Sequence, residues 1–355
     1  MLKQLFKKKA SQMIGLDIGT RYIKAVLFEQ EGSQIKVQSF ACEQINGNAF
    51  ADREIKDFDA VSNALKKVKL SLKSKKKDVV VAISGGSVLS KIVYMDPDQQ
   101  DFELETQIEI ESDSLIPYPL EEVYLDFEEL GESKTHVGKV DVLLSAAHKD
   151  VVDSRITLLR EVEFNPKVVD IESYALGNAI IEFADYPEDK PILCFNIGAS
   201  QLQLCVVLND RVIYSKEHSF GMNSLIQDLS IIHTLEKSET EQQLVNGDLP
   251  ATWREDTFPI FLANLNQHIS RAVQMYISST GAERPEAMIL SGGGANIEEI
   301  AAELEGELAI DVSIFNPFKD MQISEKAEQQ GFHKVAPQLA IAAGLASRSF
   351  KPCHM

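Results

Sequence analysis

The sequence predicts a duplicated α/β fold with two lobes and a ligand site between them, and three observations carry this prediction. Apolar residues make up 44% and charged residues 25% of the 355 residues, which is ordinary for a globular protein with a hydrophobic core. The two halves align at an offset of 179 residues, which places Asp17-Ile18-Gly19 on Asn196-Ile197-Gly198. Each of these stretches lies at the first turn of a predicted three-strand meander. Ligands of such two-lobed proteins usually bind in the crevice between the lobes.

The first half begins with three short β-rich runs and continues with an amphipathic segment. Apolar residues spaced by three or four predict a helix over residues 54–73. Strands are predicted at residues 13–18, 22–29, 34–41, 78–84 and 91–95. Because Gly85-Gly86 lies between the last two, these two strands are expected to pair as a hairpin.

The remainder of the first half alternates helices and strands. An acidic helix is predicted over residues 99–115, ended by Pro117 and Pro119. Further elements are expected at residues 123–130, 140–147 and 167–171 as strands, and at residues 152–162 and 173–183 as helices. The polar stretch 185–190 is expected to be the linker between the halves.

The second half repeats the opening of the first. Its meander is predicted from three strands at residues 192–198, 201–209 and 211–218. Mostly helical sequence follows to residue 281. A strand over 287–290 then leads into three consecutive glycines, and the remaining elements are a helix over 297–304, a strand over 311–315 and a helix over 337–347.

Charge and cysteine content exclude several classes of function. A net charge of −19 argues against binding nucleic acid over a broad face. The N-terminus has no apolar signal region, no run reaches about 18 apolar residues, and the four cysteines form no CxxC pair. Residues 101–132 hold twelve acidic and no basic residues, just after a lysine-rich run; this is either a solvated face or a docking face for a basic segment.

The duplicated glycine turns have the composition of a phosphate-binding site. Gly19 and Gly198 allow close backbone approach, while Thr20 and Lys24 add donors. Asp17 and Asn196 end the two first strands, where they are placed to hold waters of a bound Mg²⁺. Each turn alone is more often an ordinary hairpin turn. The P-loop pattern GxxxxGK[ST] and the pattern GxGxxG after a strand are both missing.

The motifs LDIGT, the second hairpin and LSGGG resemble the phosphate and adenosine motifs of the superfamily of actin, sugar kinases and chaperone ATPases. Further stretches resemble the PilM family of type IV pilus assembly proteins, which is similar to the division protein FtsA. They are LFKKK near the N-terminus, MDPDQQDFELETQIEIESDSLIPYPLEEVYLDFEEL (95–130), KVVDIESYAL (167–176), NPFKDM (316–321) and LAIAAGLASRSF (339–350). The resemblance spans nearly the whole chain.

This resemblance implies an actin-like (ribonuclease H-like) two-lobed α/β fold with an inserted α+β subdomain in the first lobe. The implied domains are a flexible basic N-terminus (1–11), a first-lobe core (12–83 and 164–187), the insert (84–163), a second-lobe core (188–225 and 286–350) and a helical second-lobe subdomain (226–285).

The resemblance also implies ATP or ADP with Mg²⁺ between the lobes. The implied nucleotide contacts are Asp17, Gly19, Thr20, Lys24, Asn196, Gly198, Gly221, Gly292, Gly293 and Gly294. Asp17 and Asn196 would hold the metal through water. Glu172 matches an acid that often approaches the metal-bound water, although an ordinary glutamate at a helix start is an equal alternative.

The implied partner is the cytoplasmic N-terminal peptide of the membrane protein PilN, in a groove between the first lobe and the insert. Ile116, Tyr118 and Glu109 are candidates for this groove, and Ile116 and Tyr118 are at least as plausible as subdomain core. The protein would then be a cytoplasmic scaffold, peripheral at the inner membrane through its partner. It would link the membrane complex to the motor, with other pilus proteins and a homo-oligomer as further associations.

One departure from the family pattern bears on catalysis. The second phosphate motif usually has Asp where this chain has Asn196, and it has Gln201 and Gln203 in place of a threonine-rich run. An amide cannot act as a carboxylate base or neutralise metal charge, so we expect nucleotide binding to be retained more securely than hydrolysis. The alternatives are an active ATPase and an FtsA-like filament protein; no sugar-kinase aspartate motif and no C-terminal amphipathic helix is found.

Overall fold

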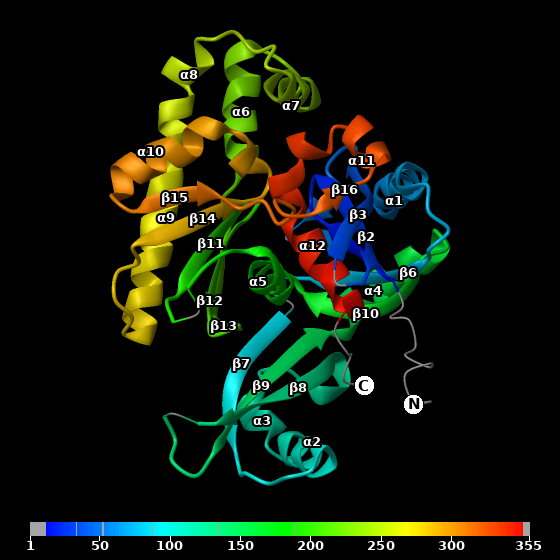
Figure 1. Cartoon of the computed structure of the whole chain (residues 1–355), viewed down its shortest axis with the longest axis vertical. Helices are drawn as coiled ribbons and strands as arrows, with labels where there is room; N and C mark the ends of the chain where they lie inside the picture. The colour runs from blue at the N-terminus through cyan, green and yellow to red at the C-terminus, as the bar shows by residue number, and fades with distance from the viewer. Residues whose placement is uncertain are drawn as a thin grey trace.

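The described residues form two large mixed sheets with helices between and around them, a three-stranded sheet to one side, and a short two-stranded sheet (Figure 1). The computed structural model describes residues 12–32, 34–51, 53–86, 88–133, 135–187 and 189–350. The basic N-terminus expected over residues 1–11 lies outside the described residues. We call the six-stranded sheet with its helices the first lobe, and the five-stranded sheet with its helices the second lobe.

The first lobe is built on a six-stranded sheet in the order β10-β6-β1-β2-β3-β16. Its strands are β1 (Ile14–Ile18), β2 (Tyr22–Glu31), β3 (Gln34–Gln44), β6 (Asp78–Ile83), β10 (Asn165–Ile171) and β16 (Gln322–Ile323). Strands β1, β2 and β3 form the predicted antiparallel meander, while β6 and β10 run parallel to β1. All five residues of β1 are buried, so this strand forms the centre of the lobe.

The second lobe repeats this arrangement in five strands, in the order β13-β12-β11-β14-β15. They are β11 (Ile192–Ile197), β12 (Leu202–Leu208), β13 (Arg211–His218), β14 (Ala287–Ser291) and β15 (Asp311–Ile314). The register repeats as well: Asp17 stands opposite Lys24 in the first lobe, and Asn196 stands opposite Gln203 in the second. The duplication seen in the sequence is therefore a duplication of strand order and of register.

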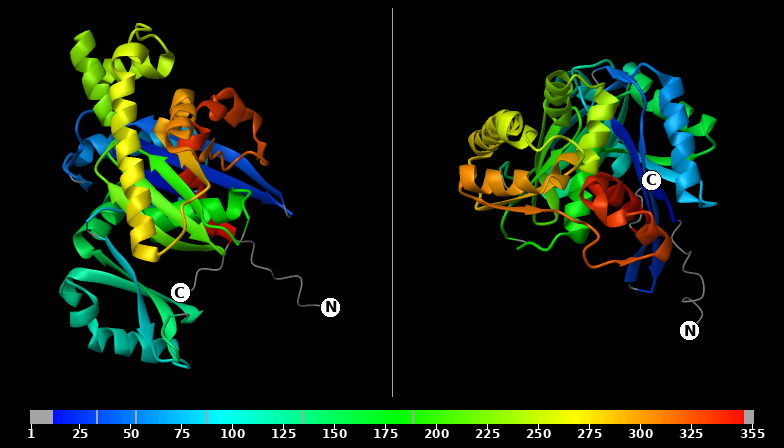
Figure 2. Two further views of the ribbon diagram at one scale, coloured as in Figure 1. Left: turned by 90° about the vertical axis from the view of Figure 1, so that its left-hand side faces the viewer. Right: turned by 90° about the horizontal axis from the view of Figure 1, so that it is seen from above.

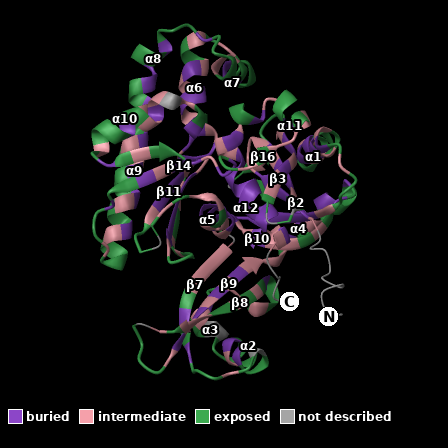
Figure 3. Cartoon of the chain, in the orientation of Figure 1, coloured by how far each residue is buried: buried purple, intermediate pink, exposed green. Residues whose placement is uncertain are grey.

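Helices α5 (Glu172–Phe183) and α12 (Ala340–Ser347) lie between the two sheets (Figure 1). Every residue of α12 is buried, as Figure 3 shows for the centre of the molecule. The two helices approach so closely that a Cβ on Gly344 would lie 1.8 Å from the carbonyl oxygen of Ala175. The run of small residues in α12 is thus what allows both lobes to pack on one helix pair.

The chain returns from the second lobe to cover the first. Strand β16 pairs in parallel with β3, and α11 (Glu325–Gln329) follows it. Phe318 and Phe332 pack edge to face at 4.8 Å, and Phe332 packs in the same way on Phe40 at 5.1 Å. The short 3₁₀ turns of this region are η3 (Phe332–Lys334), η4 (Ala336–Leu339) and η5 (Arg348–Phe350).

Helices α1 (Phe58–Leu72) and α4 (Lys149–Glu161) pack into the core cluster that contains β1, β2 and β6. Asp57 caps α1 by accepting from the Ala60 amide, and Lys73 ends it in a left-handed conformation. The predicted helix start at residue 54 is wrong, because Glu54–Ile55 form strand β5, which pairs with β4 (Phe50–Ala51). Helix α4 contributes Leu158 and Leu159 to the first-lobe core.

The inserted segment forms a three-stranded antiparallel sheet in the order β7-β9-β8 (Figure 2). Its elements are β7 (Val88–Met95), α2 (Asp101–Ile110), α3 (Ser112–Leu115), η1 (Leu120–Glu122), β8 (Val123–Glu132) and β9 (Val140–His148). The predicted hairpin across Gly85-Gly86 is wrong. Strand β6 has β1 and β10 on its two sides, so β7 pairs with β9 in the other sheet instead.

The second lobe carries a predominantly helical part on its far side. Its helices are α6 (Met222–His233), α7 (Lys237–Asn246), α8 (Trp253–Asp256), α9 (Phe258–Thr280) and α10 (Glu298–Leu308), with the turn η2 (Gly293–Asn296) before α10. Helix α9 buries Phe261, Leu265 and Ile269 against the five-stranded sheet. Among the described residues, none of the helices is long and apolar enough to cross a membrane.

Candidate functional site

The first turns of the two meanders meet between the lobes. In each turn the glycine amide donates back across the hairpin: Gly19 to the Tyr22 carbonyl at 3.1 Å, and Gly198 to the Gln201 carbonyl at 2.9 Å. The hydroxyls of Thr20 and Ser200 lie 3.0 Å apart and join the turns directly. The two halves of the repeat therefore supply equivalent turns to one site.

Glycines are required here because backbone packs on backbone. A Cβ on Gly221 would lie 2.5 Å from the Gly198 carbonyl oxygen, and one on Gly292, whose φ is +88°, would lie 2.5 Å from the Ile197 carbonyl oxygen. The first amides of α6 then donate to the second turn, with Met222 N bonding the Gly198 oxygen at 3.0 Å. Because Gly221 and Gly292 have no side chain, α6 and the turn that follows β14 can pack closely against the second turn.

The glycines of the third motif differ from one another in their surroundings. A Cβ on Gly294 would meet the Ile197 side chain at 2.4 Å, so Gly294 is packed against the second-lobe core. A Cβ on Gly293 would meet only the Gln338 side chain, at 3.6 Å. Gly293 is therefore the member of this triplet with room beside its backbone.

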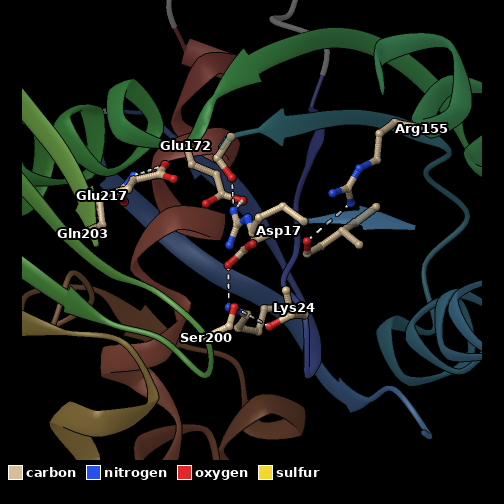
Figure 4. A network of polar contacts seen from close by, with 11 residues as sticks. Asp17, Lys24, Arg155, Glu172, Ser200, Gln203 and Glu217 are labelled. Carbon is tan, nitrogen blue, oxygen red and sulfur yellow. Dashed lines mark hydrogen bonds and ion pairs between the residues drawn. The ribbon is translucent and has the colours of Figure 1, made fainter. Parts of the chain in front are cut away.

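The first turn rests on a buried ion pair. Asp17 at the end of β1 is 2% exposed, and its Oδ2 lies 2.6 Å from Lys24 Nζ on the adjacent strand (Figure 4). Burial raises the pKa of Asp17, and Lys24 opposes this shift only in part. Burial lowers the pKa of Lys24, but the Asp17 carboxylate outweighs this effect and holds that pKa above its usual range. Lys24 is therefore a charged donor beneath the first turn.

The second turn has amides where the first has charges. Asn196 Oδ1 accepts a hydrogen bond from Ser291 Oγ at 3.3 Å, and Gln203 Nε2 donates to Glu217 Oε1 at 3.3 Å. Burial, and then the nearby Glu172 carboxylate, raise the pKa of Glu217. The repeat has thus kept its geometry but lost the ion pair in its second copy.

Glu172 begins α5 and is bound by an arginine that the sequence did not single out. Its carboxylate forms an ion pair with Arg53, and Arg53 also donates to the Ser84 hydroxyl. Burial raises the pKa of Glu172, but Arg53, the Ser84 hydrogen bond and Arg155 together lower it below its usual range. Arg53 follows β4 with a φ of +72°, an uncommon backbone conformation for arginine.

A second buried arginine lies behind the first turn. Arg155 of α4 is 4% exposed and donates from Nη1 to the Ile18 carbonyl at 3.4 Å (Figure 4). Burial lowers its pKa to about 10. Both arginines come from segments whose sequence reads as charged surface, and no pattern in the sequence indicated that either one is buried.

Beside the first turn, Arg21 and Gln44 of the first lobe contact Glu241 of the second lobe, and we call this contact the latch. Arg21, next to the first turn, donates from Nε to Glu241 Oε2 of α7 at 2.6 Å, and Gln44 donates to the same oxygen at 2.7 Å. Beside this latch lies a cavity of about 450 Å³ between the two lobes. Its lining residues are Tyr22, Gln44, Ser238, Glu239, Gln242, Val245 and Asn246.

The predicted partner-groove residues do not form one surface. Ile116 is 3% exposed and packs in the core of the insert, which is the alternative that the sequence left open for it. Tyr118 is half-buried at the junction with the first lobe, where its hydroxyl donates to the Gly86 carbonyl at 3.4 Å and its ring packs on His148. Glu109 is exposed on α2.

The residues present fit a nucleotide better than they fit a magnesium ion. Glycine turns, two hydroxyls and Lys24 are donors suited to phosphate. Both carboxylates that could bind metal-held water, Asp17 and Glu172, are already paired with cations, and Asn196 carries no charge. Within the described residues there is no group of three or more His, Cys, Asp or Glu side chains that could hold a metal. A magnesium ion held by the protein does not fit this donor set.

Comparison with known proteins identifies the architecture. A family model described as type IV pilus assembly protein PilM matches residues 15–350. The structure of a PilM-PilN type IV pilus biogenesis complex aligns with a TM-score of 0.80 and 22% identity over 97% of this chain and 100% of that chain.

Two further solved structures align at lower similarity. The ethanolamine utilization protein EutJ from Carboxydothermus hydrogenoformans gives a TM-score of 0.55 and 12% identity over 94% of this chain and 88% of that chain. A diol dehydratase-reactivating factor gives 0.54 and 8%, over 96% and 100%. These likenesses confirm the predicted actin-like, two-lobed α/β fold.

Proposed function

The chain belongs to the PilM family of type IV pilus assembly proteins, and we propose that it is a nucleotide-binding scaffold that docks the cytoplasmic N-terminal peptide of PilN. In this role it stands at the cytoplasmic side of the inner membrane through that partner and links the membrane complex to the pilus motor. Binding of ATP or ADP between the lobes is part of the proposal.

The observation that carries the nucleotide proposal is the meeting of the two glycine turns. Thr20 and Ser200 bring equivalent turns of the repeat to one place, and Lys24 supplies a buried positive charge beneath them. A polyphosphate needs donors from several directions at once, which a single hairpin turn does not offer. The joined glycine turns support a phosphate chain that lies between them. The nucleoside would then lie toward Gly293, in the turn that follows β14.

The acidic groups of the site favour nucleotide binding over ATP hydrolysis, because the candidate base is already paired and the second turn has an amide in place of a carboxylate. Glu172 is the candidate for a catalytic base that the family resemblance indicated, and its carboxylate is occupied by Arg53 and Ser84. The second turn has Asn196, which cannot accept a proton as a carboxylate does. Efficient hydrolysis would require Glu172 to leave its ion pair, so we propose a binding protein with at most weak ATPase activity.

Peptide docking is proposed at the insert, where two features suit a short basic and apolar segment. Helix α2 presents exposed acidic side chains together with exposed Phe102 and Ile110. Tyr118 and His148 lie at the junction between the insert and the first lobe. The solved relative is a complex of PilM with PilN, which makes a PilN peptide the first partner to test.

The nucleotide proposal is tested at Lys24. Replacing Lys24 with Met removes a buried cation while keeping the length of the side chain, and it should weaken ATP binding about tenfold or more, because hydrogen bonds to charged groups contribute about 1.5–3 kcal/mol. Calorimetric titration measures this, with Lys67→Met on the exposed face of α1 as the matched control. Equal affinity in both variants would place the nucleotide elsewhere.

The docking proposal is tested by reversing charge on α2. Changing Glu103, Glu105 and Glu109 together to Lys should weaken binding of a PilN N-terminal peptide, because like charges then face its basic residues. The control reverses Glu303 and Glu307, which are exposed on α10 of the other lobe. If both variants bind the peptide equally, α2 is an ordinary solvated face.

A further inference from the structure

Two buried carboxylates face the site, and each already has a cation of the chain beside it (Figure 4). Asp17 pairs with Lys24, whose Nζ is 2.6 Å away, and Glu172 pairs with Arg53. The side chains of Lys24 and Arg53 are only 17% and 13% exposed. The cations are therefore built into the interior beside the turns, and they are not loose surface groups.

The second lobe has neutral amides where the first lobe has its ion pair. Asn196 and Gln203 take the positions that Asp17 and Lys24 occupy in the repeat. One carboxylate, Glu217, lies next to them and accepts a hydrogen bond from Gln203. This turn therefore has no counterpart of the Asp17 carboxylate whose charge a magnesium ion would offset.

From this balance of charge we propose that the site binds its nucleotide without a divalent cation, because Arg53 neutralises Glu172 and Lys24 neutralises Asp17. This rests on the proposed nucleotide function. In sites where carboxylates face phosphates, a magnesium ion offsets their mutual repulsion. Here the chain's own cations do so, and Arg53 is the residue on which this independence depends.

Arginine suits this position for reasons of charge and geometry. A guanidinium stays protonated even when buried, so its charge does not depend on pH in the working range. Nη2 of Arg53, which carries two hydrogens, contacts both Glu172 and Ser84, and this joins the start of α5 to the end of β6. The chain passes next to it at Gly85, where a Cβ would lie 3.4 Å from Arg53 Cγ.

The first experiment compares nucleotide affinity with and without magnesium. ATP and ADP are titrated calorimetrically into the wild-type protein, once in excess Mg²⁺ and once in excess EDTA. The expected result is a Kd that differs between the two conditions by less than about threefold, or under ~0.7 kcal/mol. A Kd that is tenfold or more weaker in EDTA would overturn the inference while leaving the nucleotide function intact.

The second experiment assigns the effect to Arg53 by rescue. Arg53→Gln removes the ion-pair partner of the Glu172 carboxylate, so binding in EDTA should weaken about tenfold or more relative to binding in Mg²⁺. Adding Glu172→Gln removes that charge and should restore equal affinities. Because the double variant removes the Glu172 charge together with its arginine partner, it also guards against a folding defect in the single one.

An exposed arginine–glutamate pair elsewhere in the chain provides the control. Arg254→Gln breaks a comparable but exposed arginine–glutamate pair with Glu299 and should leave both affinities unchanged. A double variant that still requires Mg²⁺ would show that Glu172 is not the charge that Arg53 offsets, and would overturn the assignment. No binding in either condition by the wild-type protein would contradict the nucleotide proposal itself.

Discussion

At the scale of single residues, burial changes the chemistry of groups that look reactive in the sequence. Burial raises the pKa of the Cys42 and Cys194 thiols to about 12 and that of Cys205 well above its usual range. Because the thiolate is the reactive form, these thiols should be inert near neutral pH. They behave as small apolar side chains.

This gives a direct prediction for thiol chemistry. In a Cys353→Ser variant, which leaves only these three thiols, Ellman's reagent at about pH 8 should find almost no reactive thiol in the native protein. Only roughly one thiol in ten thousand is ionised at that pH when the pKa is about 12. Three thiols should react after denaturation. Rapid reaction of one thiol in the native state would show that its surroundings are more open than described.

Asp17, Lys24, Gly19 and Gly198 were predictable because a short motif places them at the ends of paired strands. Arg53 was not predictable, because its neighbours are Asp52 and Glu54 and such a stretch is typical of a solvated turn. Its burial results from the packing of the β4–β5 turn against residues 84–85, which are close in space and distant in sequence. The sequence left Ile116 open between core and groove, since an apolar side chain suits both, and the structure places it in the core of the insert.

At the scale of elements, the packing of α12 on α5 sets the distance between the lobes. Gly344→Ala would place a methyl group 1.8 Å from the Ala175 carbonyl oxygen, so the helices would have to separate. We expect a loss of about 2–4 kcal/mol in the free energy of unfolding. Urea denaturation followed by circular dichroism measures it.

Gly306 of α10 provides the matched control for this change. A Cβ there has no neighbour within 4 Å, and the residue lies in an exposed helix. Gly306→Ala should therefore leave stability unchanged or increase it by about 0.5–1 kcal/mol through helix propensity. If the two variants are equally stable, the α5–α12 contact is not as close as the structure shows.

Long amphipathic elements were predictable because the spacing of apolar residues within one short segment is enough to indicate a helix or a strand. The α1 stripe and both meanders follow from spacing alone. The partner of β7 was not predictable, because a glycine pair between two strands is compatible with a hairpin and with a crossing into another sheet. Strand β16 has two residues, and its pairing with β3 depends on a contact across more than 280 positions.

At the scale of the whole molecule, the hydrogen bonds of Arg21 and Gln44 to Glu241 join the two lobes directly. Glu241→Ala leaves the partly buried donors Arg21 Nε and Gln44 Nε2 without their acceptor. This should lower the free energy of unfolding by about 1–3 kcal/mol. Amide hydrogen exchange in the turns at residues 19–21 and 198–200 should become faster as the lobes open more often.

Glu239→Ala, on the exposed face of the same helix, is the control for this variant. Its carboxylate accepts only from Gln243 within α7, at 3.2 Å, so exchange in the two turns should stay as in the wild type. Unchanged exchange in Glu241→Ala as well would mean that the lobes are held together by α5 and α12 alone.

The central claim is that this chain is a nucleotide-loaded scaffold for a PilN peptide. The most direct measurement is calorimetric titration of the purified protein with a peptide from the cytoplasmic N-terminus of the candidate PilN, with and without ATP. We expect saturable binding at a defined stoichiometry, with an affinity that changes when ATP is present. An absence of peptide binding in both states, in protein that still binds nucleotide, would contradict the scaffold function and favour an enzyme or a filament-forming protein.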